Sequence, residues 1–474
     1  MAKSNFIKKF LEQVEKQPLA VAIEFDNSSI TYKELHSASL EVYSYLSEYS
    51  REEKHIGIES TSDFKSYANI IGVWMFGAAY VPLKSNYPEE VRDQILESLE
   101  IKTVLNSKEL KTALGVAKKN LNIEDSIGEC AYIIHTSGST GVPKAVFISH
   151  ENLNAFTSHY LNTSKYEFNE TDRFLQSYEL SFDVSIFCYS IPLMIGATLV
   201  LPKDKGVKYM TILSSIIKDK ITVCSNVPSV AKYALPRLSE ISMASLRYCF
   251  FSGESLFGSW AKAWMNSATN AQVYNCYGPT ETTIVCTSEH LNVLDASYFE
   301  SKEPLPLGVP FETMNLTVKD NEICFSGAQV FLGYTGGVFT IVTPQGDKHF
   351  YTGDNGILDE GGKLIFKGRS DDQIQINGFR VELSGIDTLI LKEFNLFTKS
   401  MVFSDEKKPD KILTVIEGGD WIKDDILRYL GSKLPDYSLP NDVLSTMEFP
   451  MNGNEKLDLP VLRKWCLEKL ATIN

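Results

Sequence analysis

The chain has 474 residues, of which 43% are hydrophobic and 22% are charged, and its formal net charge is −14. This length can bury a large core and form more than one domain, and the composition is typical of a globular protein. The acidic balance argues against sequence-independent binding to nucleic acid or to an anionic membrane, because such binding needs a basic face.

The eight cysteines and seven histidines are dispersed along the chain, without a C-x-x-C pair. Cysteines that lack the spacing of metal-binding motifs are, in a chain of this length, typical of reduced thiols. We therefore expect a cytoplasmic protein without a zinc site. The N-terminal segment 1–17 lacks the apolar core of a signal peptide, and the apolar run at 190–202 is too short to span a bilayer.

Apolar segments of strand length alternate with amphipathic segments of helical length. Residues 54–60 and 221–227 have the pattern of strands, and residues 63–78 and 228–238 have that of helices. From about Glu322 short strands and Gly-rich turns follow, and a polar stretch after Arg369 has the composition of a hinge. The sequence therefore predicts an α/β fold with a large N-terminal domain, residues 1–370, of layered sheets plus a small β-barrel-like subdomain. A small, mobile α+β domain would form residues 371–474.

The loop His135–Val146 joins small hydroxyl residues and glycines to one lysine. Loops of this kind wrap phosphate groups through backbone N–H groups and hydroxyls. The P-loop signature G-x-x-x-x-G-K-[ST] is absent, because Pro143 precedes Lys144 and Ala145 follows it. An ordinary Ser/Gly surface loop is the alternative. The candidate phosphate-binding residues are Thr136, Ser137, Gly138, Ser139, Thr140, Gly141 and Lys144.

This loop resembles the signature loop of the adenylate-forming enzymes, the superfamily of acyl-CoA synthetases, luciferases and peptide-synthetase adenylation domains. Their pattern Y-x-x-x-T-S-G-[ST]-T-G-x-P-K is matched from Tyr132 to Lys144. Further segments resemble the other motifs of that superfamily in the same order: 30–39, 76–88, 180–187, 277–283, 351–354, 368–383, 434–440 and 454–458. The resemblance covers nearly the whole chain. It is nearest to the amino-acid adenylation branch, which includes stand-alone adenylation domains and D-alanine–carrier protein ligases.

The resemblance implies a two-step, ATP-dependent and AMP-forming reaction. A carboxylate attacks the α-phosphorus of ATP, which gives an acyl-adenylate and pyrophosphate, and a thiol then takes the acyl group. By the same resemblance Glu281 would bind Mg²⁺, Thr280 a phosphate group, and Tyr277 and Asn275 the adenine ring and its amine. The remaining ATP-binding candidates, the last two at the ribose, are Gly253, Glu254, Gly278, Asp354 and Arg369.

Lys456 resembles the lysine that reaches between the substrate carboxylate and the α-phosphate, where a cation offsets the charge of two meeting anions. The usual motif is N-G-K-x-D, whereas here Glu455 replaces the glycine. A solvated surface lysine is the alternative interpretation. Asp371 would be the hinge about which the C-terminal domain rotates between the two half-reactions.

Asp183 lies in the apolar run 180–187, at the position where amino-acid activators bind the α-ammonium group of their substrate. A buried carboxylate is costly unless it meets a cation, so this residue favours an amino acid as substrate. The resemblance predicts a pocket without charged side chains and therefore a small to medium uncharged amino acid, whose identity and hand remain open. The pocket residues would be Val184, Phe187, Ser225, Phe250, Ser252, Cys276, Ile284 and Val285.

Because the chain ends soon after Lys456, we expect the acceptor to be the phosphopantetheine thiol of a separate carrier protein. Two alternatives remain at this stage. The chain could deliver the acyl group to coenzyme A or to a free amine, or it could be a non-catalytic module that binds a nucleotide or an amino acid. We expect no nucleic-acid or membrane partner.

Overall fold

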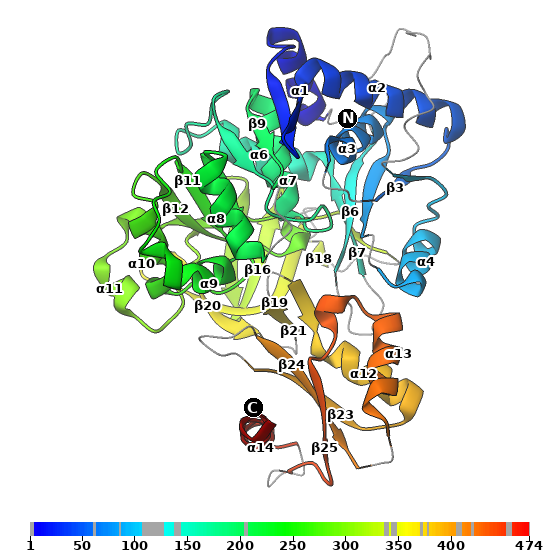
Figure 1. Ribbon diagram of the computed structural model, residues 1–474, viewed down its shortest axis with the longest axis vertical. Coiled ribbons are helices and arrows are strands. Elements are labelled where there is room, and N and C mark those ends of the chain that lie inside the picture. Colours follow the sequence, from blue (N-terminus) through cyan, green and yellow to red (C-terminus); the bar gives the residue numbers. More distant parts are fainter. Residues whose placement is uncertain are drawn as a thin grey trace. The chain divides into compact units, whose positions relative to one another are not determined.

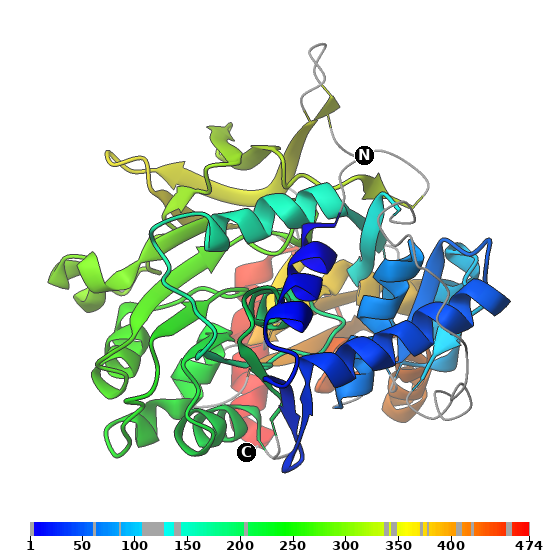
Figure 2. The ribbon, with the colours of Figure 1, turned by 90° about the horizontal axis from the view of Figure 1, so that it is seen from above.

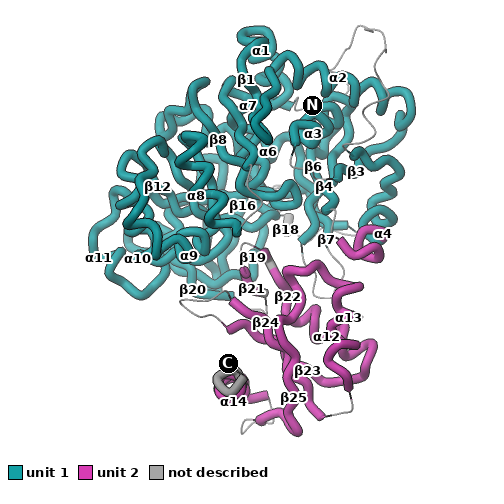
Figure 3. Tube along the Cα trace, in the orientation of Figure 1, with its two compact units in different colours: residues 1–85, 94–136, 144–370 teal, residues 86–93, 137–143, 371–474 magenta. Residues whose placement is uncertain are grey.

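A computed structural model describes most of the chain, and Figure 3 divides it into two compact units. The first unit comprises residues 1–85, 94–136 and 144–370, and the second comprises residues 86–93, 137–143 and 371–474. The described residues are 4–59, 63–84, 87–106, 128–136, 144–202, 207–335, 341–342, 348–369, 373–376, 379–403, 410–418, 421–451 and 457–473.

The first unit contains a six-stranded sheet in the order β17-β7-β6-β4-β3-β5. Its parallel part is followed by the antiparallel pair β6 and β7, in which Thr136 lies opposite Lys144. The two ends of the predicted phosphate loop are therefore neighbours in this sheet. The strands are β3 (His55–Glu59), β4 (Ala79–Leu83), β5 (Val104–Leu105), β6 (Cys130–Thr136), β7 (Lys144–Ser149) and β17 (Gly333–Tyr334).

A nine-stranded sheet has the order β14-β13-β12-β11-β10-β8-β9-β1-β2, and its neighbours from β12 to β1 are parallel. The parallel strands are short and apolar, as expected where helices or loops cover both faces. The strands are β1 (Val21–Phe25), β2 (Ser28–Thr31), β8 (Arg173–Leu175), β9 (Thr198–Val200), β10 (Val223–Asn226), β11 (Tyr248–Phe251), β12 (Gln272–Tyr277), β13 (Thr287–His290) and β14 (Val309–Pro310).

Helices link these two sheets through one continuous core (Figure 1). Trp74 of α3 donates to a backbone carbonyl of β6 and packs against Tyr189 of α7, while Phe187 of α7 packs against Phe250 of β11. In Figure 2, α1 lies between the green part of the nine-stranded sheet and the blue strands of the other. The helices of the first unit are α1 (Asn5–Lys16), α2 (Tyr32–Tyr49), α3 (Phe64–Phe76), α6 (His150–Leu161), α7 (Val184–Ile195), α8 (Lys208–Lys218), α9 (Pro228–Leu238), α10 (Gly258–Ser267) and α11 (Ala296–Glu300), whereas the residues of α4 (Glu89–Ser98) are divided between the two units.

A third sheet of five antiparallel strands stands where the sequence predicts the barrel-like subdomain. Its hairpin β15–β16 turns through Asp320 and Asn321, both with positive φ, as a two-residue turn between twisted strands requires. The predicted α/β class with an antiparallel subdomain is confirmed. The strands are β15 (Met314–Lys319), β16 (Glu322–Gly327), β18 (Ile341–Val342), β19 (Lys348–Leu358) and β20 (Leu364–Arg369).

The second unit has an α+β core of its own, in which Ile386 and Ile390 of α12 pack with Ile412, Ile416 and Ile426. Its elements are β21 (Gln373–Ile376), β22 (Phe379–Glu382), α12 (Leu383–Phe394), β23 (Thr398–Phe403), β24 (Lys411–Glu417), α13 (Lys423–Lys433), β25 (Asp442–Thr446) and α14 (Leu459–Ile473). Over the described part of the whole chain, no helix combines the length and the apolar character that crossing a membrane needs.

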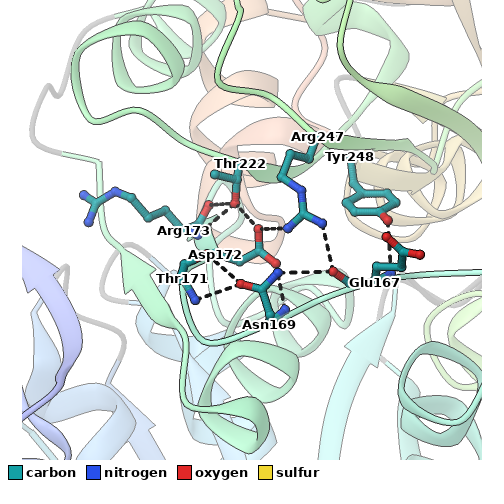
Figure 4. Close-up of polar contacts among 8 residues, drawn as sticks. All are labelled: Glu167, Asn169, Thr171, Asp172, Arg173, Thr222, Arg247 and Tyr248. Carbon is teal, nitrogen blue, oxygen red and sulfur yellow. Dashed lines mark hydrogen bonds and ion pairs between the residues drawn. The ribbon is translucent and has the colours of Figure 1, made fainter.

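A buried carboxylate joins the amino-terminal ends of three parallel strands (Figure 4). Asp172, which is 1% exposed, precedes β8 and accepts hydrogen bonds from Thr222, before β10, at 2.7 Å and from Arg247, before β11, at 2.6 Å. Its second oxygen accepts the backbone N–H of Asn169 at 2.9 Å. This network fixes the edge of the sheet opposite to the carboxyl ends of these strands.

We expect Asp172→Ala to lower the free energy of unfolding by about 2 kcal/mol, because it removes charge-assisted hydrogen bonds to a buried group. Urea unfolding followed by tryptophan fluorescence measures the change. The exposed neighbour Glu170 provides the control, because Glu170→Ala should change stability by less than about 0.5 kcal/mol. Equal losses in the two variants would contradict a structural role for the network.

Candidate functional site

Strand β12 distributes the predicted site residues over both faces of its sheet. Consecutive side chains of a strand point to opposite faces, so Asn275 and Tyr277 share one face and Cys276 lies on the other. The candidate nucleotide residues and the candidate pocket residues alternate in the sequence for this reason.

Asp354 is the centre of a polar group that the structure assembles from three strands. The Tyr277 hydroxyl donates to one carboxylate oxygen, and the Arg369 guanidinium, opposite Asp354 in the β19–β20 register, pairs with the other. Burial, and then the negative charge of Asp354, raises the pKa of Tyr277 well above its ordinary value, so the phenol remains a donor. All three residues were predicted from the sequence as ATP-binding candidates, and the structure brings them together.

Asn275 is fully buried, and its amide is only half satisfied. The side-chain NH₂ donates to the carbonyl oxygens of Leu305, at 3.3 Å, and Pro306, at 2.9 Å. Its Oδ1 has no hydrogen-bond partner within the described residues. Because buried polar atoms are normally paired, this oxygen fits a ligand that supplies an N–H donor, such as the exocyclic amine of adenine.

The segment between β12 and β13 forms a tight turn closed by a hydrogen bond from Cys286 N to Tyr277 O of 2.8 Å. A Cβ on Gly278 would lie 2.5 Å from the Cα of Val285, so only glycine allows this close approach. The turn contains the 3₁₀ helix η2 (Thr280–Thr282). It carries the candidate metal ligand and two candidate pocket residues within a few positions of each other.

Glu281 is 1% exposed, and its carboxylate accepts a hydrogen bond from the Tyr334 hydroxyl. Its backbone carbonyl accepts the N–H of Phe331 at 2.9 Å. A carboxylate held in this way is a hard oxygen donor of the kind that Mg²⁺ prefers. The described residues contain no cluster of three or more His, Cys, Asp or Glu that could hold a metal. A cation bound by Glu281 would therefore take further ligands from phosphate oxygens and water.

The candidate pocket residues that belong to strands, Ser225, Phe250 and Cys276, share one face of the nine-stranded sheet. Ser225 and Phe250 lie side by side in the β10–β11 register, and Ser252 follows two residues after Phe250 on the same face. Phe187 of α7 packs against Phe250 with ring centroids 5.2 Å apart. Of the eight predicted pocket residues, seven are buried and Val184 is partly buried.

An aromatic layer supports the two phenylalanines from behind. The ring of Tyr160 lies 4.8 Å from that of Phe187 and 5.7 Å from that of Phe250, and Tyr274 stacks on Phe250 at 5.2 Å. Because all of these side chains are buried and closely packed, the rings of Phe187 and Phe250 cannot move away from the pocket without displacing their neighbours. The wall that they form therefore has a fixed position.

Asp183 precedes α7 and is 9% exposed. Burial raises the pKa of its carboxyl group to about 7, and hydrogen bonds from Thr280 and from the backbone N–H of Val184 offset only part of that effect. The nearby charge of Glu281 raises the pKa further. The desolvated carboxylate therefore lies next to the turn and at the amino-terminal end of the helix that carries Phe187.

Several predicted residues lie outside the described residues, namely Ser137, Gly138, Ser139, Thr140, Gly141, Asp371 and Lys456. Thr136 and Lys144 are described and flank the loop. Gly253 is exposed with φ +87°. Glu254 accepts hydrogen bonds from the backbone N–H of Ser229, at 2.8 Å, and from its hydroxyl, at 3.2 Å, so its carboxylate caps the start of α9.

Sequence reasoning missed Tyr334 and Gln329, which contact the turn from about fifty residues away in the chain. A signal was present, because Gln329 interrupts the apolar run "AQVFLG". A buried polar residue in such a run needs hydrogen-bond partners, although the sequence does not say which.

A family model described as "AMP-binding enzyme" matches residues 10–335. The chain therefore belongs to the AMP-binding enzyme family, and the resemblance predicted from the motifs is confirmed. The D-alanine–D-alanyl carrier protein ligase of Lactococcus lactis is 28% identical over 497 residues, which cover 96% of this chain and 98% of the ligase. A linear gramicidin synthase protein of Brevibacillus parabrevis is 30% identical over 95% of this chain, but the chain spans only 6% of that protein's length.

Solved structures share the fold. The adenylation domain AlmE of Vibrio cholerae, in complex with glycyl-adenosine-5′-phosphate, matches with a TM-score of 0.84 and 22% identity over 99% of this chain and 98% of that chain. A peptide-synthetase protein containing adenylation and carrier domains matches with a TM-score of 0.85 and 20% identity over 97% of this chain and 84% of that chain.

We expect Asn275→Leu to weaken ATP binding by about ten- to a hundred-fold, because the hydrogen bond that we propose between Asn275 Oδ1 and the adenine amine would be lost. The variant also removes two internal hydrogen bonds, so the comparison is made with purine riboside triphosphate, which lacks the exocyclic amine. The native chain should prefer ATP over this analogue, and Asn275→Leu should bind the two equally. A retained preference, measured by calorimetry, would place the adenine amine elsewhere.

Proposed function

We propose that this chain activates a small to medium uncharged amino acid as its aminoacyl-adenylate and transfers it to the phosphopantetheine thiol of a separate carrier protein. The observation that carries the proposal is the buried carboxylate of Asp183. It lies beside Thr280 and Glu281, and it directly precedes α7, the helix that carries Phe187.

The amino group of an amino acid would supply a cation to this carboxylate. A desolvated carboxyl group with a pKa near 7 is poorly stabilised as an anion, and a nearby ammonium group favours its charged form. A carboxylic acid without an amine would leave the desolvation cost uncompensated. The site therefore favours amino acids over fatty or aryl acids.

The similar proteins support the same interpretation. They include a D-alanine–D-alanyl carrier protein ligase that matches this chain over nearly its whole length, and the solved neighbours include an adenylation domain bound to a glycyl-adenylate. Alanine and glycine are both small amino acids. The wall formed by Phe187 and Phe250 accords with that class, because its aromatic support limits the depth of the pocket.

Charge neutralisation and positioning would carry the first half-reaction, in which the substrate carboxylate attacks the α-phosphorus and pyrophosphate leaves. Asn275, Tyr277, Asp354 and Arg369 would hold the nucleoside. Glu281 would hold Mg²⁺, which offsets phosphate charge when bound. Thr280 and the loop from Thr136 to Lys144 would bind phosphate oxygens, and Gly253, Glu254 and Gly278 would shape the site.

The residues at the domain boundary and beyond it complete the proposal. Lys456 would enter during adenylation and offset the charge of the two approaching anions. Rotation about Asp371 in the boundary between residues 1–370 and 371–474 would then admit the carrier thiol. These two assignments rest on the motifs alone.

The deciding experiment is amino-acid-dependent exchange of labelled pyrophosphate into ATP across all proteinogenic amino acids and D-alanine. Exchange with a small uncharged amino acid is expected. No exchange with any of them would favour a binding module. A second assay offers the adenylate to a phosphopantetheinylated carrier protein, to coenzyme A and to free amines, and the thioester should form on the carrier. Product on coenzyme A or on an amine would instead establish the alternative ligases.

Activity should depend on the ionisation of Asp183. Because the charged carboxylate binds the ammonium, kcat/KM for the amino acid should fall about ten-fold per pH unit well below the pKa of about 7. ATP binding should change much less. Asp183→Asn should lower kcat/KM and abolish its fall at low pH. A pH profile of kcat/KM that is unchanged in the variant would contradict the assignment.

The same shift has a consequence for stability. A folded-state carboxyl pKa above the unfolded value stabilises the fold at low pH, and this contribution is lost as pH rises through the folded pKa. Asp183→Asn should therefore raise the melting temperature at pH 8 more than at pH 5, which thermal unfolding of the substrate-free protein measures.

We also expect Phe187→Leu to deepen the pocket. The ratio of kcat/KM for a larger aliphatic amino acid to that for alanine should rise about ten-fold, since a single methylene is worth about 1–3 kcal/mol in such a pocket. Phe251→Leu is the matched control, because Phe251 lies on the opposite face of β11 and packs against Trp264. Equal changes of the ratio in the two variants would show that Phe187 does not line the pocket.

A further inference from the structure

The turn between β12 and β13 has a backbone conformation that its residue types disfavour. Thr283 has φ +60° and Ile284 has φ +75°, so two consecutive β-branched residues lie in the left-handed region. Such residues occur there only where surrounding contacts impose the conformation. Thr283 and Ile284 come two and three residues after Glu281, and Ile284 is itself a candidate pocket residue.

Gln329 supplies contacts of this kind. It is fully buried, and its Nε2 lies 3.1 Å from the carbonyl oxygen of Thr282, 3.4 Å from that of Thr283 and 2.9 Å from that of Val285. In return the Thr283 hydroxyl donates to the backbone carbonyl of Gln329 at 2.6 Å. One side chain therefore binds the backbone before, within and after the strained pair.

The amide of Gln329 is itself oriented. The Thr313 hydroxyl donates to its Oε1 at 3.2 Å, which directs the NH₂ group toward the turn. The carbonyls on either side of Gln329 in the chain, those of Ala328 and Val330, accept hydrogen bonds from the Asn152 side chain at 2.7 and 3.0 Å. The segment that carries Gln329 is thus anchored to the start of α6.

The same segment reaches the carboxylate of Glu281. Phe331 donates its N–H to the Glu281 carbonyl, and Tyr334 donates its hydroxyl to the Glu281 carboxylate. Tyr334 belongs to β17, which pairs with β7 at Val146, two residues after Lys144. The tyrosine is therefore placed by the sheet that also carries the phosphate loop.

We propose that Gln329 and Tyr334 are positioning residues, which set the Glu281 carboxylate and the pocket wall at Ile284 and Val285 in one geometry. Gln329 holds the backbone of the turn, and Tyr334 orients the carboxylate. This proposal rests on the proposed function of the site. By this proposal one short segment, residues 329–334, fixes the position of the candidate metal ligand relative to the amino-acid pocket.

The first experiment uses Gln329→Met, which keeps the length of the side chain and removes its hydrogen bonds. We expect kcat of pyrophosphate exchange to fall by about a hundred-fold at saturating substrates, because a small misplacement of catalytic groups has effects of this size. Selectivity among amino acids should change as well, since Ile284 and Val285 move with the turn. Thr313→Val should produce the same changes to a smaller degree, and it provides the test if Gln329→Met does not fold.

Tyr32→Phe is the control for a loss of stability alone. Its buried hydroxyl donates to the carbonyl oxygens of Pro192, at 3.1 Å, and Ala197, at 2.7 Å, away from the turn. The control should lower the melting temperature and leave kcat and selectivity unchanged. If Gln329→Met and Thr313→Val lose only stability, as Tyr32→Phe does, Gln329 is not a positioning residue.

The second experiment measures metal binding without turnover. Mn²⁺ is titrated into the ATP-bound protein and followed by electron paramagnetic resonance, and ATP affinity is measured by calorimetry with Mg²⁺ and with EDTA. Tyr334→Phe should weaken Mn²⁺ binding by about ten- to a hundred-fold, as is typical when the partner of a metal ligand is removed. ATP affinity in EDTA should not change. Unchanged Mn²⁺ affinity would overturn the role of Tyr334.

The two proposals can fail separately. If the native chain supports no amino-acid-dependent exchange, the proposed function fails, while the Mn²⁺ titration still decides whether Tyr334 orients Glu281. If the native chain is active and selective but the variants at Gln329, Thr313 and Tyr334 match the native chain in kcat, selectivity and Mn²⁺ affinity, only the positioning proposal fails.

Discussion

The tight turn between β12 and β13 is the constraint on which the site depends. One hydrogen bond, from Cys286 N to Tyr277 O, closes it, and the missing side chain of Gly278 lets its two sides approach. The chain must turn back within nine residues while it presents Glu281 to one region and Ile284 to another. Two strained residues, Thr283 and Ile284, lie in this turn, and strain of this kind persists only where the surrounding structure imposes the conformation.

The strain requires support, and the support determines which distant parts of the first unit must be close together. Gln329 holds the backbone of the turn, Tyr334 contacts Glu281, and Tyr277 at the base of the turn binds Asp354 of the third sheet. The three sheets of this unit thus meet at one short segment. Positions at a metal or nucleotide site must be set to within fractions of an ångström, and convergence of several elements on rigid strands is a way to achieve that.

The sequence predicted local features better than these long-range contacts. The helix expected at 228–238 is α9, Pro228–Leu238, because its apolar spacing and its proline at the first position are local signals. The partners Tyr277, Asp354 and Arg369 were also predicted, but from motifs and not from any rule that brings them together. Gln329 and Tyr334 were missed, since a hydrogen bond between residues about fifty positions apart leaves no periodic trace. The positive φ of Thr283 and Ile284 was equally hidden, because residues of that type predict a strand.

The parallel sheet has a buried carboxylate near each of its two edges, and the two carboxylates differ in how their charge is compensated. At the amino-terminal ends of β8, β10 and β11 the buried carboxylate of Asp172 is fully paired, with Arg247, Thr222 and a backbone N–H. Near the carboxyl ends Asp183 is buried as well, and desolvation raises its pKa to about 7. Each arrangement fits the role that we propose for its carboxylate. A structural carboxylate gains most when its partners are permanent, whereas a carboxylate that recognises a cationic group must leave that position to the ligand. Under the proposed function, the stability forgone at Asp183 in the free protein would be recovered when an ammonium group binds, so that the same desolvation that destabilises the empty site would make it selective.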